Sequence, residues 1–263
     1  GASHGYTCAV LDNNEMKCWG KAENGSLGNG DDSQNQYTPV GVNELDSNTC
    51  CFPDIEETSP DGDHSCALSD GSLYCWGLDT AGQIGHGHLS CGGYCENPHG
   101  PSVLNRNIVT FTTGLRHTCA IADDSTAWCW GENDFGQLGL GDNDDRNAPA
   151  QVLLPAGATP ISINAGGHTT CVILDNGTGL CWGKSDYGHL GDGTYNDRNE
   201  PTPISILPSN RSLVAMDLGA GHACGILDDG TAHCWGNGTF SSGESGGRLG
   251  DGSNESSRFP RSV

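Results

Sequence analysis

Short apolar segments alternate along the whole chain with turns rich in glycine, asparagine and aspartate. One of these turns is the dipeptide Asp70-Gly71, which is typical of a two-residue β-hairpin. Pairing the chain outward from this turn brings Cys66 directly opposite Cys75. The pattern therefore predicts a β-hairpin that carries one cysteine on each strand.

Four further segments repeat this hairpin with a cysteine spacing that is one residue longer. A three-residue loop restores the same pairing. The third residue of such a loop usually has a left-handed backbone, which Gly and Asn tolerate and which makes Ser125 the poorest fit. The predicted cross-strand pairs are Cys8 with Cys18, Cys66 with Cys75, Cys119 with Cys129, Cys171 with Cys181, and Cys224 with Cys234.

Residues that face each other on paired strands lie about 4.5–5.5 Å apart at Cα, a distance that a disulfide can bridge. The chain holds 14 cysteines, an even number. Five pairs of buried free thiols are the alternative. However, the two cysteines lie opposite each other in hairpins with either loop length, which favours disulfides. We therefore expect disulfides and a secreted, extracellular protein. No signal peptide precedes the first hairpin, so we expect a mature or trimmed form.

The tripeptide Cys-Trp-Gly ends each hairpin and recurs every 52 to 57 residues. A Leu-Gly or Ile-Gly turn follows it, and then a proline-containing extended segment such as 148–152. Further strand candidates lead into three of the repeats, at 108–111, 161–164 and 213–216. About four short strands per repeat predict an all-β fold, a β-propeller of five units. A linear β-solenoid is the alternative.

We expect one propeller domain, 1–263, in which the first unit lacks its leading strand because only three residues precede His4. The expected units are 1–42, 43–107, 108–160, 161–212 and 213–263. Three arrangements remain open. The five units could close into a ring by sharing strands, belong to a larger propeller, or be completed by a neighbouring subunit as a homo-polymer.

Residues 117–141, from His-Thr-Cys-Ala-Ile through Cys-Trp-Gly to Leu-Gly-Leu-Gly, show the repeat most clearly. This stretch resembles the regulator of chromosome condensation repeat, in the cysteine-bearing version found in secreted proteins. The motif Asp-Arg-Asn-x-Pro at 145–149 and 197–201 matches the same family. The resemblance implies a β-propeller, commonly of seven blades. It implies no common chemistry, because members include exchange factors, inhibitors and scaffolds.

Four cysteines lie outside the hairpins, namely Cys50, Cys51, Cys91 and Cys95. We expect two disulfides that link the first two of them to the last two, in an order that the sequence leaves open. The alternative is a zinc site in which His86 and His88 join the last two cysteines.

Histidine recurs just before the first hairpin cysteine of each unit, at His4, His64, His117, His168 and His222. Five histidines at one repeat position indicate structural hydrogen bonds, and a pH-sensing ring is the alternative. Acidic residues gather after the glycine turns, for example Asp192 and Asp251. Since none of these loops ends in the glutamate of a known calcium loop, we interpret them as solvated turns.

The sequence contains no catalytic motif, so we expect no enzyme activity, no catalytic residue, no metal and no cofactor. Five N-glycosylation sequons begin at Asn24, Asn176, Asn210, Asn237 and Asn254. Acids outnumber bases 33 to 11, and the net charge of −22 argues against nucleic acid and anionic membrane surfaces. No run of about 18 apolar residues exists to span a membrane.

These observations favour a non-catalytic extracellular scaffold that recognises a protein or a glycan. A more specific hypothesis within that class is that the protein is the structural subunit of an extracellular filament or surface assembly. An inhibitor of a secreted enzyme is the alternative, and a lyase or hydrolase is less favoured. Insertions at 43–63, 88–101 and 238–248 break the repeat, and we expect partner specificity there.

Overall fold

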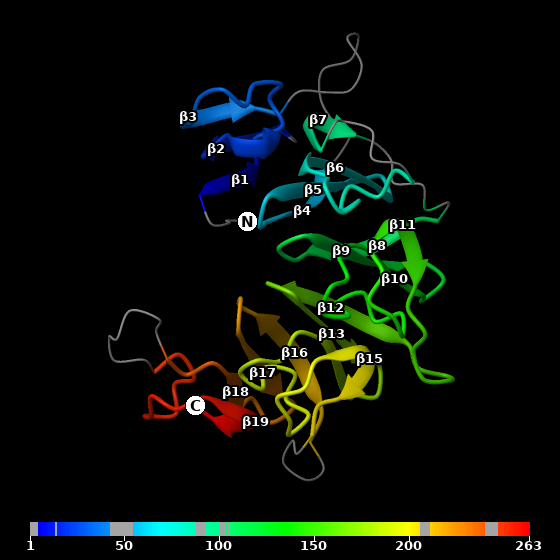
Figure 1. Ribbon diagram of the computed structural model, residues 1–263, viewed down its shortest axis with the longest axis vertical. Helices are drawn as coiled ribbons and strands as arrows, with labels where there is room; N and C mark the ends of the chain where they lie inside the picture. Colours follow the sequence, from blue (N-terminus) through cyan, green and yellow to red (C-terminus); the bar gives the residue numbers. More distant parts are fainter. Residues whose placement is uncertain are drawn as a thin grey trace. The chain divides into compact units, whose positions relative to one another are not determined.

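The computed structural model describes residues 5–13, 15–42, 55–87, 93–99, 104, 106–205, 211–239 and 247–263. Over these ranges the protein is all-β apart from one short 3-10 helix, η1 (Glu23–Gly25). The strands form five antiparallel sheets in which each strand pairs with its neighbour in sequence (Figure 1). The chain divides into two compact units. A single domain with the five repeat boundaries given above stays a prediction.

Unit 1 comprises Gly1–Asp124, Trp128–Glu132 and Asp145–Gln151, and contains the first three sheets apart from Ala127. Its first sheet has three strands, as the sequence predicts, and the next two have four. The strands are β1 (Tyr6–Val10), β2 (Met16–Gly20), β3 (Gln36–Gly41), β4 (Ile55–Asp61), β5 (His64–Ser69), β6 (Ser72–Leu78), β7 (Tyr94–His99), β8 (Ile108–Thr113), β9 (His117–Ala122), β10 (Ala127–Gly131) and β11 (Arg146–Gln151).

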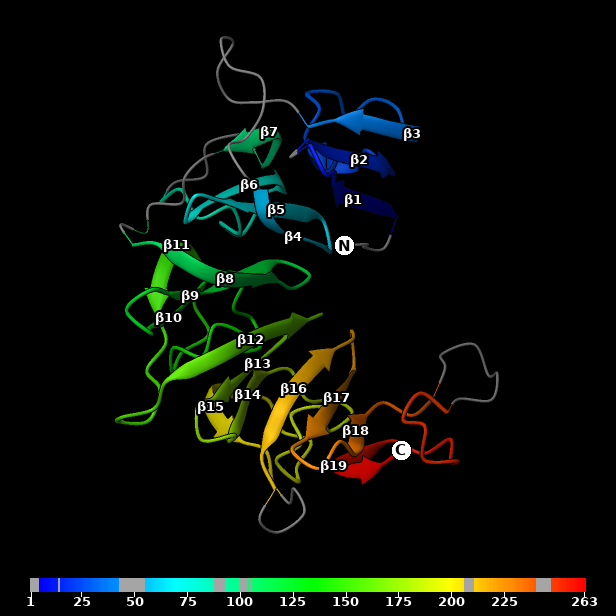
Figure 2. The same ribbon diagram turned by 180° about the vertical axis from the view of Figure 1, so that it is seen from behind.

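Unit 2 comprises Ser125–Ala127, Asn133–Asp144 and Val152–Val263, and contains two four-stranded sheets. The strands are β12 (Pro160–Gly166), β13 (Thr169–Leu174), β14 (Gly179–Gly183), β15 (Arg198–Pro203), β16 (Leu213–Leu218), β17 (His222–Leu227), β18 (Ala232–Gly236) and β19 (Ser257–Ser262). Within this unit β12 lies beside β16, so the first strands of the two sheets are neighbours (Figure 2).

The hairpin register predicted from turn length is confirmed, with Cys66 opposite Cys75 across β5 and β6. The left-handed backbone expected at the third loop position is present even at Ser125, where φ is 63°. A disulfide cross-links the two strands of the cysteine-bearing hairpin in each sheet, over a sequence separation of 9 or 10 residues. They join Cys8 to Cys18, Cys66 to Cys75, Cys119 to Cys129, Cys171 to Cys181, and Cys224 to Cys234.

A β-bulge interrupts the first strand of each four-stranded sheet, one residue after the strand begins. In three sheets the bulged residue is apolar and points to solvent, because the extra residue shifts the alternation of side chains. These residues are Val109, Ile161 and Val214, which are 59%, 55% and 57% exposed. The strand periodicity alone did not reveal this shift.

A tryptophan contact, here called the indole latch, recurs four times. The Trp of one hairpin donates its indole N–H to the carbonyl that precedes the Leu-Gly or Ile-Gly turn of the preceding repeat. The pairs are Trp76 with Ser26 (3.0 Å), Trp130 with Gln83 (3.0 Å), Trp182 with Gln137 (2.9 Å) and Trp235 with His189 (2.9 Å). Glycine is required beneath the ring, because at Gly139 (φ +69°) a Cβ would lie 2.8 Å from the Trp182 Nε1.

The hydrophobic core lies between adjacent sheets of each unit. In unit 1, Leu68 of the second sheet packs in one cluster with Phe111 and Trp130 of the third. In unit 2, Ile173 of the fourth sheet shares a cluster with Trp235 of the fifth. Each sheet therefore presents two different faces, one with its cysteines and an aliphatic residue, and one with its Trp.

Candidate protein-interaction site

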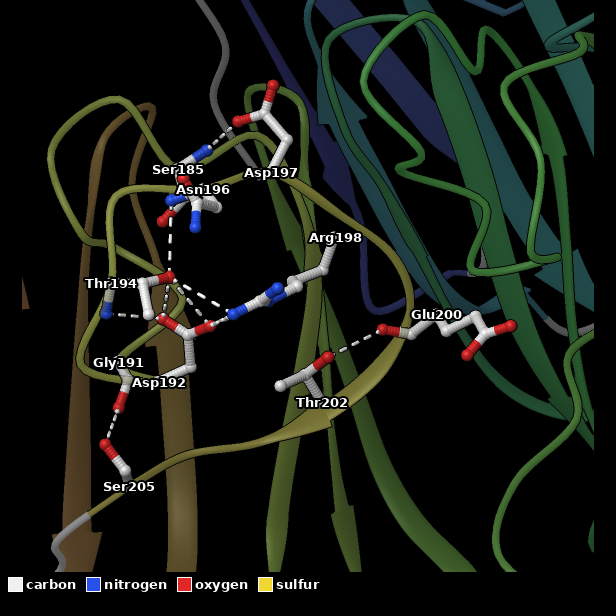
Figure 3. Close-up of polar contacts among 10 residues, drawn as sticks. All are labelled: Ser185, Gly191, Asp192, Thr194, Asn196, Asp197, Arg198, Glu200, Thr202 and Ser205. Atoms are coloured by element: carbon white, nitrogen blue, oxygen red, sulfur yellow. Dashed lines mark hydrogen bonds and ion pairs between the residues drawn. The ribbon is translucent and has the colours of Figure 1, made fainter.

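A network of hydrogen bonds fixes the loop that joins β14 to β15 in unit 2 (Figure 3). The Asp192 carboxylate accepts hydrogen bonds from the backbone N–H and the hydroxyl of Thr194, both at 2.8 Å. Arg198 donates from Nε to the other carboxylate oxygen at 2.8 Å, and its Nη2 lies 2.7 Å from the same oxygen. We call Asp192, Thr194 and Arg198 the loop clasp.

The acidic residue of the loop clasp is almost completely buried, since the Asp192 side chain is only 3% exposed. Burial by itself would raise the pKa of Asp192, but the hydrogen bonds from Thr194 and Arg198 outweigh it and hold the pKa below its usual value. The interpretation of this acid as part of a solvated turn was therefore wrong. Its oxygens are occupied by the protein itself.

Two more hydrogen bonds tie the same loop to its surroundings (Figure 3). The backbone N–H of Ser185 donates to the Asp197 carboxylate at 2.7 Å. The Ser205 hydroxyl donates to the carbonyl of Gly191 at 3.1 Å. Together with the loop clasp, these contacts hold Tyr195, which lies inside the loop, on a rigid support.

Tyr195 belongs to a group of surface side chains, here called the aromatic patch and defined as the exposed Tyr187, Tyr195 and Arg258 and the half-buried Phe259. The two tyrosines are 45% and 51% exposed. The exposed Arg258 guanidinium carbon lies 5.4 Å from the centre of the Tyr195 ring and 5.5 Å from that of Phe259. Strand β19 also packs tightly on Gly188, beside Tyr187, where a Cβ would be 2.5 Å from that of Arg258.

A second clasp forms at the corresponding turn of the fifth sheet. The Asp251 carboxylate accepts hydrogen bonds from Arg261 at 2.9 Å and from Ser253, whose backbone N–H is at 2.9 Å and hydroxyl at 2.8 Å. These bonds, that of Arg261 above all, lower the pKa of Asp251 to about 2. This acid, too, is a structural anchor and not a solvated turn.

The clasp at Asp251 should persist in mild acid. Because its folded pKa of about 2 lies below the ordinary 3.8, the stability that it contributes is complete above about pH 4 and is lost as the pH falls through 2. Asp251→Asn should therefore lose less stability than the parent protein between pH 4 and pH 2, as measured by thermal unfolding. Asp12→Asn, at an exposed carboxylate in a hairpin loop, is the control. Equal losses in all three proteins would contradict the assignment.

The repeated histidines are placed at the edge of their hairpins. His64 is fully buried, its Nε2 lies 2.9 Å from the Thr118 hydroxyl, and burial lowers its pKa to about 3. His117 is also buried, His168 and His222 are half-buried, and His4 lies outside the described residues. The geometry of His64 agrees with a structural role, because a neutral imidazole is retained there across the physiological pH range.

The remaining cysteine predictions fall largely outside the described residues, where Cys50, Cys51 and Cys91 lie. Cys95 on β7 is buried and disulfide-bonded. Its sulfur is therefore no thiolate ligand for zinc. Within the described ranges, no group of three or more His, Cys, Asp and Glu side chains is arranged to hold a metal ion.

The five sequons differ in accessibility. Asn176 and Asn254 are exposed, whereas Asn24 and Asn237 are half-buried. Asn210 lies outside the described residues. Glycosylation at all five stays a prediction, and exposure favours Asn176 and Asn254, which the mass of the protein from its natural source would reveal.

Sequence reasoning missed the aromatic patch because it sought specificity in the insertions, most of whose residues the structure does not describe. A signal was present, however. When the sheets are aligned on their Leu-Gly turns, Arg258 of the fifth sheet takes the place of Asn147 in the third and Asn199 in the fourth. In the same way, Tyr195 of the fourth sheet takes the place of Asn143 in the third. Surface positions at which one sheet differs from the repeat are therefore the sequence feature that could have indicated the patch.

Comparison with known proteins explains the recurring geometry. The family described as the regulator of chromosome condensation (RCC1) repeat matches residues 70–121, 124–173 and 176–226, and a second description of the same repeat matches 108–137 and 213–242. This chain belongs to the RCC1 repeat family. Its sheets are therefore the blades of an RCC1-type β-propeller, the fold class that the sequence predicted.

Relatives within the RCC1 family cover much of the chain. The E3 ubiquitin-protein ligase HERC2 of Homo sapiens is 28% identical over 99% of this chain and 5% of its own length. The ultraviolet-B receptor UVR8 of Arabidopsis thaliana is 31% identical over 79% of this chain and 45% of its own length. The chain thus spans less than half the length of these two relatives.

A solved RCC1-type structure confirms the fold. Prp20p from Saccharomyces cerevisiae superposes with a TM-score of 0.79 at 21% identity, covering 98% of this chain and 61% of Prp20p. In the part of the chain that the structure describes, no helix is long and apolar enough to cross a membrane.

Proposed function

We propose that this protein is an extracellular, non-catalytic propeller that binds a protein partner through the aromatic patch. The patch is the observation that carries the proposal, since the exposed Arg258 guanidinium lies over the exposed ring of Tyr195 and beside Phe259, and the exposed Tyr187 precedes the glycine on which Arg258 packs. Tyr and Arg are enriched among the residues that dominate binding energy at interfaces. Tyrosine also offers a large contact area at a low cost in conformational entropy.

The extracellular location is supported by the disulfides. Five bonds close the central hairpins, and their sulfurs are buried in four of the five sheets. Disulfides at this density are typical of oxidising compartments. Nucleotide exchange on a nuclear GTPase, an activity of some members of the family, would instead require a reducing compartment.

The charge of the chain points to the kind of partner. A net charge of −22 attracts basic surfaces at long range and repels acidic ones. Prp20p itself has binding properties to Gsp1p and histones, which shows that this fold serves protein recognition in a relative. A basic extracellular protein is therefore the partner that we propose.

Two other functions remain candidates. An inhibitor of a secreted enzyme is favoured by the same acidity, because an acidic surface complements a basic enzyme cleft. A glycan partner would use the tyrosines as stacking platforms and would bind without strong dependence on salt.

The proposal can be tested by placing a photo-reactive phenylalanine analogue at position 195. The labelled protein would be irradiated in the extracellular fraction of the source organism, and the adducts identified by mass spectrometry. The same analogue at position 37 is the matched control, because Tyr37 is 92% exposed on strand β3 and does not belong to the patch. We expect a basic protein that is cross-linked from position 195 alone.

The identified partner then allows affinities to be measured. Tyr195→Ala or Arg258→Ala should weaken its binding by about 30-fold, as expected of central interface residues, whereas Tyr37→Ala should change it less than about twofold. Added salt should weaken the complex. Identical adducts from both positions, or no effect of the patch substitutions, would overturn the proposal. Binding of a glycan in place of a protein would select the recognition of sugars.

A further inference from the structure

Arg258 of the aromatic patch forms no ion pair with any carboxylate of the residues that the structure describes. This is unexpected in a chain whose acidic residues outnumber its basic ones by 33 to 11. Four other arginines do pair with aspartates, namely Arg106, Arg198, Arg211 and Arg261. Because Arg258 is also exposed, its N–H groups are available to an acceptor on another molecule.

The contact between Arg258 and Tyr195 replaces a polar pair of the repeat. One sheet earlier, the side-chain N–H of Asn199 donates to the side-chain carbonyl of Asn143 at 3.3 Å. Arg258 takes the place of Asn199, and Tyr195 takes that of Asn143. The two asparagines use polar atoms on each other. A tyrosine ring instead covers the face of a guanidinium and leaves the N–H groups in its plane free.

The backbone around this contact is fixed within unit 2. The backbone N–H of Gly193 donates to the carbonyl of Arg258 at 3.2 Å. A Cβ added at Gly193 would lie 2.7 Å from Cε1 of Phe259, so the loop and strand β19 are in close contact. The loop clasp holds the same loop. Groups that are already ordered lose little conformational entropy when they bind.

A carboxylate is the ligand that this arrangement fits. A guanidinium carries five N–H donors in a planar fork, which matches the two oxygens of a carboxylate. The neighbouring acidic residues narrow the choice further, since Asp197 follows Tyr195 by two residues, Glu255 precedes Arg258 by three, and both are exposed. They would repel a phosphate dianion more than a singly charged carboxylate, and would attract basic residues placed beside it.

We infer that Arg258 binds the carboxylate of an Asp or Glu on the partner protein, a residue that is flanked there by Lys or Arg. The inference rests on the proposed function, because it names the group that the aromatic patch recognises on a basic protein. Two N–H groups of Arg258 donate to the two carboxylate oxygens, while the Tyr195 ring covers one face of the guanidinium. The net charge of −22 therefore attracts a basic partner, and Arg258 selects one acidic position on its surface.

The test uses a random peptide library displayed on phage and selected on the oxidised parent protein. We expect the enriched peptides to carry Asp or Glu flanked by Lys or Arg. One such peptide, made synthetically, then allows a double-mutant cycle by calorimetry. On the parent protein, replacement of its acidic residue by the amide should weaken binding about 10-fold, whereas on Arg258→Asn the same replacement should matter less than about twofold.

The variants separate charge, geometry and folding. Asparagine is the residue that the third and fourth sheets carry at this place, so Arg258→Asn should fold, which thermal unfolding would verify. Arg258→Lys keeps the charge but loses the planar fork, and should weaken binding about fivefold. Arg211→Asn is the matched control, because Arg211 is an exposed arginine that already pairs with Asp228 and Asp229. It should leave peptide affinity unchanged.

Failure of this inference can be told apart from failure of the proposed function. Enriched peptides that need Tyr195, as shown by Tyr195→Ala, but are indifferent to replacement of the acidic residue would overturn the carboxylate assignment and leave the patch as the binding surface. Enriched peptides that bind Tyr195→Ala as well as the parent protein would count against the patch itself, and so against both proposals. A selection that enriches no acidic peptide would overturn the inference alone.

Discussion

Reduction of the disulfides is expected to unfold the protein at room temperature, under conditions in which the oxidised chain stays folded. Each of the five bonds closes a loop with a sequence separation of 9 or 10 residues. Loop closure of this length contributes about 3 kcal/mol through the entropy of the unfolded chain. Five such contributions are comparable with the whole stability of a typical protein, about 5–15 kcal/mol.

Urea unfolding followed by tryptophan fluorescence, with and without a phosphine reductant, measures this effect. The double variant Cys171→Ala with Cys181→Ala isolates one bond and should lower the free energy of unfolding by about 3 kcal/mol. Among the five hairpin bonds, the one between Cys224 and Cys234 should be reduced first, because Cys224 is half-buried whereas both cysteines of the other four are buried. An unchanged unfolding midpoint after complete reduction would contradict the stabilising role.

Loss of a buried indole should be the most damaging single substitution. Trp182 is 0% exposed and donates to the Gln137 carbonyl at 2.9 Å, so Trp182→Ala removes both apolar packing and a buried hydrogen bond. We expect a loss of about 3–5 kcal/mol, the usual cost of such a cavity. Thr170 also donates to the same carbonyl, at 2.9 Å, so this oxygen keeps one partner.

The chain offers its own control for this substitution. Trp19 occupies the same repeat position, but it is half-buried and makes no described hydrogen bond, so Trp19→Ala should cost only about 1–2 kcal/mol. Equal costs at the two positions would show that the indole latch does not stabilise the sheets.

The hairpins could be predicted because their determinants are local. Turn length sets the register, and the register places the cysteines opposite each other, as at Cys66 and Cys75. The left-handed position at Ser125 followed from the same count, even though serine is a poor choice there. No knowledge of the rest of the molecule was needed.

The remaining features depend on contacts between distant residues. The indole latch joins Trp182 to a carbonyl 45 positions earlier, and no local pattern announces that bond. The bulge that exposes Val214 arises from pairing between strands. Asp192 looked like one of many surface acids until Arg198 and Thr194 were found to enclose it. The aromatic patch brings β19 against the preceding sheet, and its residues are spread over more than 70 positions of sequence.

Each of the five disulfides described above lies within a single sheet, and this arrangement determines how the protein responds to proteolysis. A cut in a hairpin loop, for example beside Asn176, would leave β13 and β14 covalently joined through Cys171 and Cys181. A nicked chain would then release no fragment until it met a reductant. A cut between sheets, for example near Pro155, would break a connection that none of the five bonds spans. The two pieces on either side of such a cut would therefore no longer be covalently joined.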